Sequence, residues 1–245
     1  MRIAIVSYRG GTGKSLIAIN LAKALTFDTL LIEADFFAPS LAYMRSHQGK
    51  YWNDYLLGNC NSKEIIQMVE NIKVVYTNPD DPHIFTHIQN KDLWRGHFSN
   101  RILDFFKTQK ERSFILIDNQ AGRYLSSLTH IFFSDFVICV LRPDKSDVIA
   151  TAKYLETLKK DFYLVWNQVL PHSRLKKAIS EWNEQFFVPQ ETYKGTLGLI
   201  PFDEETAIQR WVDRKLFIQD TRFTEAIKEI AQKLVMMAME QDKIQ

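Results

Sequence analysis

The chain has 245 residues, of which 46% are hydrophobic, and this is enough for one large α/β domain, which we expect to span residues 1–245. The formal net charge of +2 favours no particular class of partner, although it leaves room for a local basic patch. Cys60 and Cys139 are far apart in the sequence and neither has a second cysteine nearby, so the chain shows no disulfide framework and no metal-ligand spacing of cysteines. No signal peptide or membrane-length apolar run is visible, and we expect a cytoplasmic protein.

A glycine-rich loop follows the first predicted strand. Residues 3–6 are a short apolar run typical of a buried strand, and residues 16–25, in an expected helix over 14–26, have helical periodicity. Between them lies Arg9-Gly10-Gly11-Thr12-Gly13-Lys14-Ser15. Glycines let successive backbone N–H groups converge on phosphate oxygens, and the helix N-terminus adds partial positive charge. We expect Lys14 to reach the β- and γ-phosphates of a nucleotide and the Ser15 hydroxyl to ligate Mg²⁺.

Two further predicted strands end in carboxylates. Residues 29–35 are a buried strand that carries Glu33 and Asp35, and residues 113–118 are an apolar run that ends in Asp118. Ligands of open α/β sheets gather at the carboxyl ends of the strands. The three carboxylates are therefore expected to face the phosphates and their metal ion.

The remaining pattern alternates between strands and helices. Residues 42–70 are expected to be a helical insertion, with Trp52 and Tyr55 in the core, and residues 91–110 a helix. His83 and His87 are expected to be ordinary histidines rather than metal ligands. Further strands are predicted at 72–76, 136–141, 162–167 and 197–202, and further helices after Asp144, from 172 onward and over 220–241.

The glycine-rich loop resembles the deviant Walker A sequence, K-G-G-x-G-K-[ST], of the MinD/ParA ATPases. Arg9 stands where that family has its first lysine. Other motifs follow in the family's order. They are Pro-Ser-Leu at 39–41, the Walker B aspartate Asp118 with the segment 119–122 after it, Asn167 at the end of a strand, and a G-x-I-P-x-D segment at 198–203. The resemblance implies a three-layer P-loop NTPase fold with a mostly parallel central sheet flanked by helices, and a site for ATP or ADP with Mg²⁺.

The resemblance also implies roles around the phosphates. Asp118 and Glu33 act on Mg²⁺, each through water, and Asp35 positions the attacking water. The Gly122 N–H meets the γ-phosphate. Gln120 replaces a family proline and is a second candidate for orienting water, as a glutamine does in some GTPases.

At the other end of the nucleotide, the resemblance implies that Asn167 hydrogen-bonds adenine and that Pro201 and Asp203 flank the base. An asparagine amide has the donor and the acceptor that the adenine edge requires. Arg9 takes the place of the lysine that reaches across a dimer to the partner's nucleotide, and its planar guanidinium differs from a lysine point charge.

The sequence supports two main functions. The first is an ATP-hydrolysing switch that dimerises with ATP and acts in partitioning or positioning DNA or a protein assembly. The second is a nucleotide-loaded scaffold with negligible hydrolysis that recruits a partner protein, because Arg9, Glu33 and Gln120 depart from the family pattern. A phosphoryl-transfer or ligase relative is a third, for which no residues specify an acceptor.

Two groups of basic residues are candidate surfaces for DNA or a partner protein. They are Arg174, Lys176 and Lys177 in one group, and Arg210, Arg214 and Lys215 in the other. The final helix has an apolar stripe that predicts docking onto the domain. Its mixed charges disfavour a membrane surface.

Overall fold

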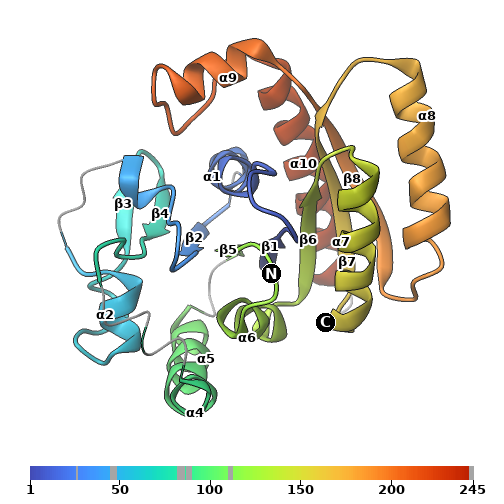
Figure 1. Cartoon of the computed structure of the whole chain (residues 1–245). Helices are drawn as coiled ribbons and strands as arrows, with labels where there is room; N and C mark the ends of the chain where they lie inside the picture. The colour runs from blue at the N-terminus through green and yellow to red at the C-terminus, as the bar shows by residue number, and fades with distance from the viewer. Residues whose placement is uncertain (26, 45–48, 82–85, 87–89, 110–112, 243–245) are drawn as a thin grey trace.

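The computed structural model describes residues 1–25, 27–44, 49–81, 86, 90–109 and 113–242 (Figure 1). His83 and His87 lie outside these described residues. Within these ranges the strands form one sheet of eight, in the order β3-β4-β2-β5-β1-β6-β7-β8. The strands are β1 (Arg2–Val6), β2 (Thr29–Ala34), β3 (Gln67–Val69), β4 (Ile72–Val75), β5 (Phe114–Asn119), β6 (Phe136–Leu141), β7 (Phe162–Val169) and β8 (Tyr193–Pro201).

All neighbouring strands pair in parallel except β3 and β4, which are antiparallel. The central strands are buried on both faces, and this is why they are near-continuous apolar runs in the sequence. Along β1, for example, Ile3 and Ile5 pack on one face and Ala4 and Val6 on the other. The predicted fold, a mostly parallel sheet flanked by helices, is confirmed.

The helices cover both faces of the sheet. In the described ranges they are α1 (Lys14–Ala24), η1 (Ala42–Met44), α2 (Trp52–Leu56), α4 (Lys91–Leu93), η2 (Trp94–Phe98), α5 (Ser99–Thr108), α6 (Leu125–Phe133), α7 (Lys145–Leu158), α8 (Ser173–Trp182), η3 (Asn183–Phe187), α9 (Glu204–Trp211) and α10 (Arg222–Asp242). On one face, α1 and α10 share a core with the sheet. On the other face, α2 and α5 form a second core, and α6, α7 and α8 form a third.

Helix α10 docks by its apolar stripe, as the sequence predicts. Phe223, Ile227, Ile230 and Leu234 are all buried against β8 and α1. No helix in the part of the chain that the structure describes is long and apolar enough to cross a bilayer.

Two segments differ from the predicted helices. In the described part of 42–70 only η1 and α2 are helical, and β3 forms a hairpin with β4. Glu70 adopts a φ of 51° in the tight turn between the two strands, and such left-handed turns match the twist of a hairpin. The predicted helix 91–110 is divided by a π-helical turn at η2 (Trp94–Phe98), which brings both of its terminal aromatic side chains into the core.

Candidate functional site

The glycine-rich loop connects β1, in the middle of the sheet, to the N-terminus of α1. Strand β1 lies between β5 and β6, where the strand order reverses and an open α/β sheet has its binding crevice. Gly11 and Gly13 have φ values of 74° and 92°, which only glycine adopts without strain. Gly13 is the N-cap of α1, so the first N–H groups of this 11-residue helix face the crevice.

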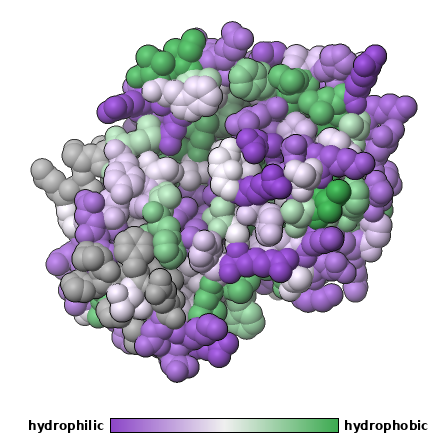
Figure 2. Space-filling model, in the orientation of Figure 1, coloured by the Kyte–Doolittle hydropathy of each residue, from purple (hydrophilic) through white to green (hydrophobic). Residues whose placement is uncertain are grey.

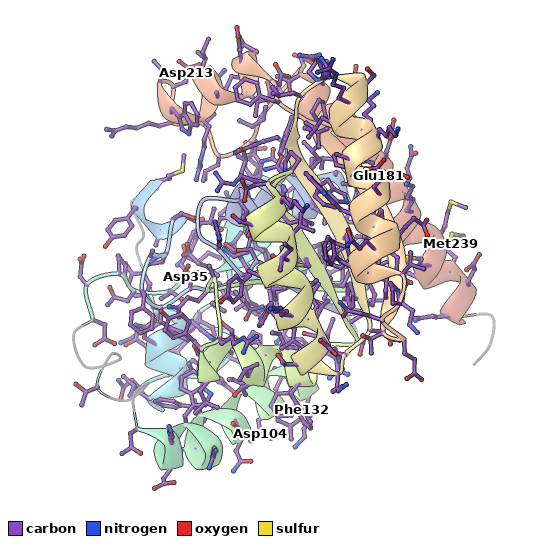
Figure 3. All side chains as sticks on the ribbon, turned by 45° about the vertical axis from the view of Figure 1, so that its right-hand side comes forward. Asp35, Asp104, Phe132, Glu181, Asp213 and Met239 are labelled. Atoms are coloured by element: carbon purple, nitrogen blue, oxygen red, sulfur yellow. The ribbon has the colours of Figure 1, made fainter. Side chains whose placement is uncertain are left out.

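A pocket of about 770 Å³ opens at this edge of the sheet. It brings together residues from the glycine-rich loop, from the ends of β2, β5, β7 and β8, and from α9. Of the predicted site residues, those that line it are Gly10, Gly11, Gly13, Lys14, Ser15, Asp35, Asn167, Pro201 and Asp203, together with the alternative water-orienting residue Gln120. In Figure 3, Asp35 is labelled below α9, the helix that leads to Asp213 at the top of the view.

Asp118 lies beneath the pocket at the end of β5 and is 1% exposed. Among the described residues neither of its carboxylate oxygens accepts a hydrogen bond of good geometry, although the Ser15 hydroxyl is close enough to stabilise its charge. Burial raises the pKa of Asp118 to about 6, and the Lys14 ammonium and Ser15 hydroxyl oppose that rise. A buried carboxylate that accepts no well-formed hydrogen bond from the described residues and lies beside a serine hydroxyl fits a cation site of oxygen ligands.

Asp35 follows β2 and is half-buried. Its Oδ1 accepts hydrogen bonds from the backbone N–H groups of Phe37 and Ala38, at 3.1 and 2.9 Å. These bonds fix the carboxylate in a tight turn at the pocket wall. Because they use one oxygen, the other is left to accept a bond from a water molecule in the pocket.

Glu33 does not line the pocket, contrary to its predicted place at the metal. Its carboxylate accepts hydrogen bonds from the backbone N–H groups of Leu41 at 2.6 Å, Ala42 at 3.2 Å and Thr77 at 3.4 Å. Burial raises the pKa of Glu33 to about 8 against the effect of these bonds. Both oxygens thus join two loops, and the contact of Glu33 with Mg²⁺ through water stays a prediction.

The segment after Asp118 joins β5 to the loop after β1, and the contact of Gly122 with a phosphate stays a prediction. The Gly122 N–H, assigned by resemblance to a γ-phosphate, donates to the Ser7 carbonyl at 3.0 Å. Strands β1 and β5 pair in parallel, so the residues that follow their carboxyl ends lie close enough for this hydrogen bond. Gln120 is 6% exposed and lies at the pocket wall, so its position is compatible with contact to a bound water.

Asn167 lies against the glycine-rich loop as well as the pocket. Its Nδ2 donates to the Thr12 carbonyl at 2.7 Å, while the Thr12 side chain is buried below the loop. A Cβ at Gly13 would lie 2.3 Å from that nitrogen. The asparagine therefore supports the loop from β7 and needs a glycine at position 13 to do so. Its Oδ1 and second N–H stay available for a base.

Pro201 and Asp203 lie at the far end of the pocket, where β8 leads into α9. The Asp203 carboxylate caps α9 by accepting from the Glu205 N–H at 3.2 Å. It also accepts from the Arg222 N–H at 3.0 Å. Asp203 therefore holds the starts of α9 and α10 together, in addition to any contact with a ligand.

Arg9 points away from the pocket, toward α7. Its Nε lies 3.7 Å from Oδ1 of Asp147, which is 1% exposed. Burial raises the pKa of Asp147, and Arg9 is among the groups that lower it. In this structure Arg9 is thus held by a buried carboxylate of its own chain.

Arg210 lies in a different place from the one that the sequence predicts. We predicted it in a surface basic patch, but it is half-buried and lines the pocket with Lys14 and Asp35. Arg214 and Lys215, its predicted companions, are exposed. Ala207 and Arg210 are three residues apart, which places their side chains on one face of α9, and this spacing is visible in the sequence.

The described residues contain no cluster of three or more histidine, cysteine or acidic side chains arranged to hold a metal by themselves. A cation at this site would need oxygen atoms from Ser15, Asp118, water and a bound phosphate. The pocket is therefore suited to a metal that arrives with an anionic ligand.

No known protein-family model matches the chain. Among curated proteins, it is 26% identical over 164 residues to an uncharacterised ATP-binding protein of Methanocaldococcus jannaschii, a match that covers 64% of the chain but only 59% of that relative. A second uncharacterised ATP-binding protein of the same organism is 22% identical, over 99% of the chain and 88% of the relative.

Solved structures with a similar fold cover the chain almost completely. The septum site-determining protein MinD of Pyrococcus horikoshii, complexed with Mg-ADP, superposes with a TM-score of 0.76 at 20% identity, over 97% of this chain and 96% of that one. A putative plasmid partition protein of Borrelia burgdorferi, bound to AMPPNP, gives 0.73 at 17% identity over 96% and 98%. The McdA–ATP complex of Cyanothece gives 0.73 at 13% identity over 96% and 95%. The chain thus has the P-loop fold of the MinD/ParA-type ATPases, and the resemblance indicated by its motifs is confirmed at the level of the fold.

Proposed function

We propose that this protein is an ATP-binding and ATP-hydrolysing switch of the MinD/ParA type, formed by residues 1–245 as one domain, which dimerises with ATP and acts in partitioning or positioning DNA or a protein assembly. One observation carries the proposal. Lys14 and Ser15, at the N-terminus of α1, lie beside the buried carboxylate of Asp118 at one end of a pocket large enough for a nucleotide, and neither oxygen of that carboxylate accepts a hydrogen bond of good geometry from the described residues.

In this proposal the chain holds the phosphates and Mg²⁺ at the α1 end of the pocket. The backbone N–H groups of 10–15 and the Lys14 ammonium bind phosphate oxygens, and the Ser15 hydroxyl and Asp118 bind the metal. When bound, Mg²⁺ neutralises charge that develops on the phosphates. Lys14 is 8% exposed, and a cation in such a desolvated place interacts more strongly with phosphate than it would in water.

Asp35 orients the attacking water in this proposal. Its Oδ1 is fixed by the two backbone bonds, so the remaining carboxylate oxygen can accept a hydrogen bond from a water and hold it in line with the terminal phosphate. Gln120 is the alternative water-orienting group. The Asn167 amide, Pro201 and Asp203 are assigned to the adenine end.

An ATP-dependent homodimer is supported by the surface around the pocket. Ile208, Trp211 and Val212 of α9 and the following turn are 48%, 73% and 73% exposed, and Figure 2 shows apolar side chains gathered at the top of the view, where α9 lies. A second copy that covered this face would bury them. Arg9 would reach the partner's nucleotide only after leaving Asp147.

DNA or a protein partner would use the exposed basic residues Arg174, Lys176, Lys177, Arg214 and Lys215. Lys177 pairs with Glu181 at 3.8 Å and Lys215 with Asp213 at 3.7 Å, and these pairings reduce the positive charge available to phosphates. A nucleotide-loaded scaffold that recruits a protein is therefore the second candidate function. Its supporting observation is that Glu33 and Gly122 are both used in internal hydrogen bonds.

The experiment that tests the switch measures mass in solution by light scattering for Asp35→Ala with Mg-ATP and with Mg-ADP. We expect a dimer with ATP and a monomer with ADP, because loss of the water-orienting carboxylate traps the ATP state. Asp92→Ala, which removes an exposed carboxylate on α4, is the matched control. One mass in both states would contradict ATP-dependent dimerisation.

Phosphate release separates the switch from the scaffold. The switch predicts steady-state release by the wild-type chain and by Asp92→Ala, with turnover lost in Asp35→Ala. The scaffold predicts ATP binding without turnover in any of the three. Equal turnover by Asp35→Ala and wild type would refute the role of Asp35.

A further inference from the structure

The Arg210 guanidinium faces the nucleotide pocket from the helix opposite the glycine-rich loop. Helix α9 begins after Asp203, and Arg210 follows Asp203 by seven residues, which places it about 10 Å further along the helix axis. It lines the same pocket as Lys14, Ser15 and Asp35. The helix thus leads from the proposed adenine end of the pocket toward the end that carries the carboxylates.

Arg210 has no ion-pair partner within the ranges that the structure describes. The polar contact of its Nη1 is the thioether sulfur of Met44 in η1. Thioether sulfur is a weak acceptor, whereas a guanidinium carries five donors. A half-buried cation with such a poor partner has most of its hydrogen-bonding capacity left for a ligand.

The charges around Arg210 indicate which part of a ligand it would meet. Burial lowers the pKa of Arg210, and the negative charges of Asp118 and Glu33 raise it. In turn, Arg210 is among the cations that lower the pKa of Asp118. The guanidinium therefore lies within electrostatic range of the carboxylate beside Lys14 and Ser15, where the metal and the terminal phosphates are expected.

Helix α9 is braced so that Arg210 keeps this position. Gln209 Nε2 donates to the Gln219 carbonyl at 3.0 Å, and its Oε1 accepts from the Gln219 N–H at 3.1 Å. The Thr206 hydroxyl is 3.2 Å from that of Thr221. These bonds fix α9 to the segment that leads into α10, so the helix backbone at Arg210 loses little conformational freedom when the arginine binds an anion.

We propose that Arg210 binds the terminal phosphate of the nucleotide from within the same chain, as a second arginine besides Arg9. The inference rests on the proposed function of the pocket as an ATP site. A guanidinium fork matches two phosphate oxygens at once and does so without a dimer partner. Because ADP lacks the γ-phosphate, Arg210 makes the pocket favour ATP over ADP.

Calorimetric titration with Mg-ATP and with Mg-ADP tests this assignment on the full chain. Arg210→Gln is expected to weaken ATP binding by roughly 10- to 100-fold, as for the loss of a charge-assisted bond, and to change ADP binding by less than about two-fold. The matched control is Arg95→Gln, which removes an exposed arginine in η2 away from the pocket and should leave both affinities unchanged. Arg210→Lys keeps the charge and should retain a reduced preference for ATP.

The outcomes separate this inference from the function on which it rests. If the wild-type chain binds neither nucleotide, the proposed function fails. If wild type binds ATP, but Arg210→Gln binds ATP and ADP as wild type does or loses both equally, the Arg210 assignment is overturned and its contact with Met44 is only packing. Should Arg210→Gln fail to fold, the comparison of Arg210→Lys with wild type decides by the same criterion.

Discussion

Replacing Gly13 by alanine should destabilise the folded chain before any ligand is added. The new Cβ would lie 2.3 Å from Nδ2 of Asn167, so the amide must move and its bond to the Thr12 carbonyl is lost. That bond is worth about 0.5–1.5 kcal/mol. The φ of 92° adds a backbone strain of about 1–3 kcal/mol for a residue with a side chain.

The expected loss is therefore about 1.5–4.5 kcal/mol in the free energy of unfolding, measured by urea denaturation without nucleotide. Gly10→Ala is the matched control in the same loop, because a Cβ there meets nothing within 4 Å. In an Asn167→Ala background the clash disappears, so Gly13→Ala should then cost only the backbone strain. If Gly13→Ala is as stable as Gly10→Ala, the support of the loop by Asn167 is refuted.

Two further predictions concern other buried contacts. Burial raises the pKa of Glu33 from 4.5 to about 8, so the folded state holds a proton that the unfolded state releases, and the stability of the wild-type chain falls as the pH rises from 4.5 to 8. Urea denaturation across this pH range should show Glu33→Gln gaining stability relative to wild type, because glutamine does not titrate. A stability difference that stays constant with pH would contradict the raised pKa. Gly198→Ala would place a Cβ 2.8 Å from Cγ1 of Ile230, where β8 meets α10, and should lower the stability by about 1–3 kcal/mol through overpacking. In an Ile230→Ala background, thermal denaturation should show that Gly198→Ala no longer has this cost. An equal cost with Ile230 and with Ala at position 230 would place the strain elsewhere.

The sequence alone determined the elements that depend on local pattern. A buried strand, a glycine turn and a helix are neighbours in the chain, so the loop at 10–15 and its place at the N-terminus of α1 follow from residue order. The apolar run before Asp118 likewise places that carboxylate at the end of a strand, and parallel strands bring their carboxyl ends to one edge. The apolar residues of α10 recur with helical periodicity, and this stripe predicted that the helix docks onto the domain.

Only the tertiary structure decided which partner each polar side chain takes. The sequence places Glu33 at the metal, but in the structure its carboxylate accepts hydrogen bonds from the backbone N–H groups of residues 41, 42 and 77. Arg9 pairs with Asp147, which lies in helix α7. Arg210 lines the pocket because the tertiary fold brings α9 beside the glycine-rich loop and the strand ends. Such contacts depend on how distant loops meet, and a local pattern of hydrophobic and polar residues carries no information about them.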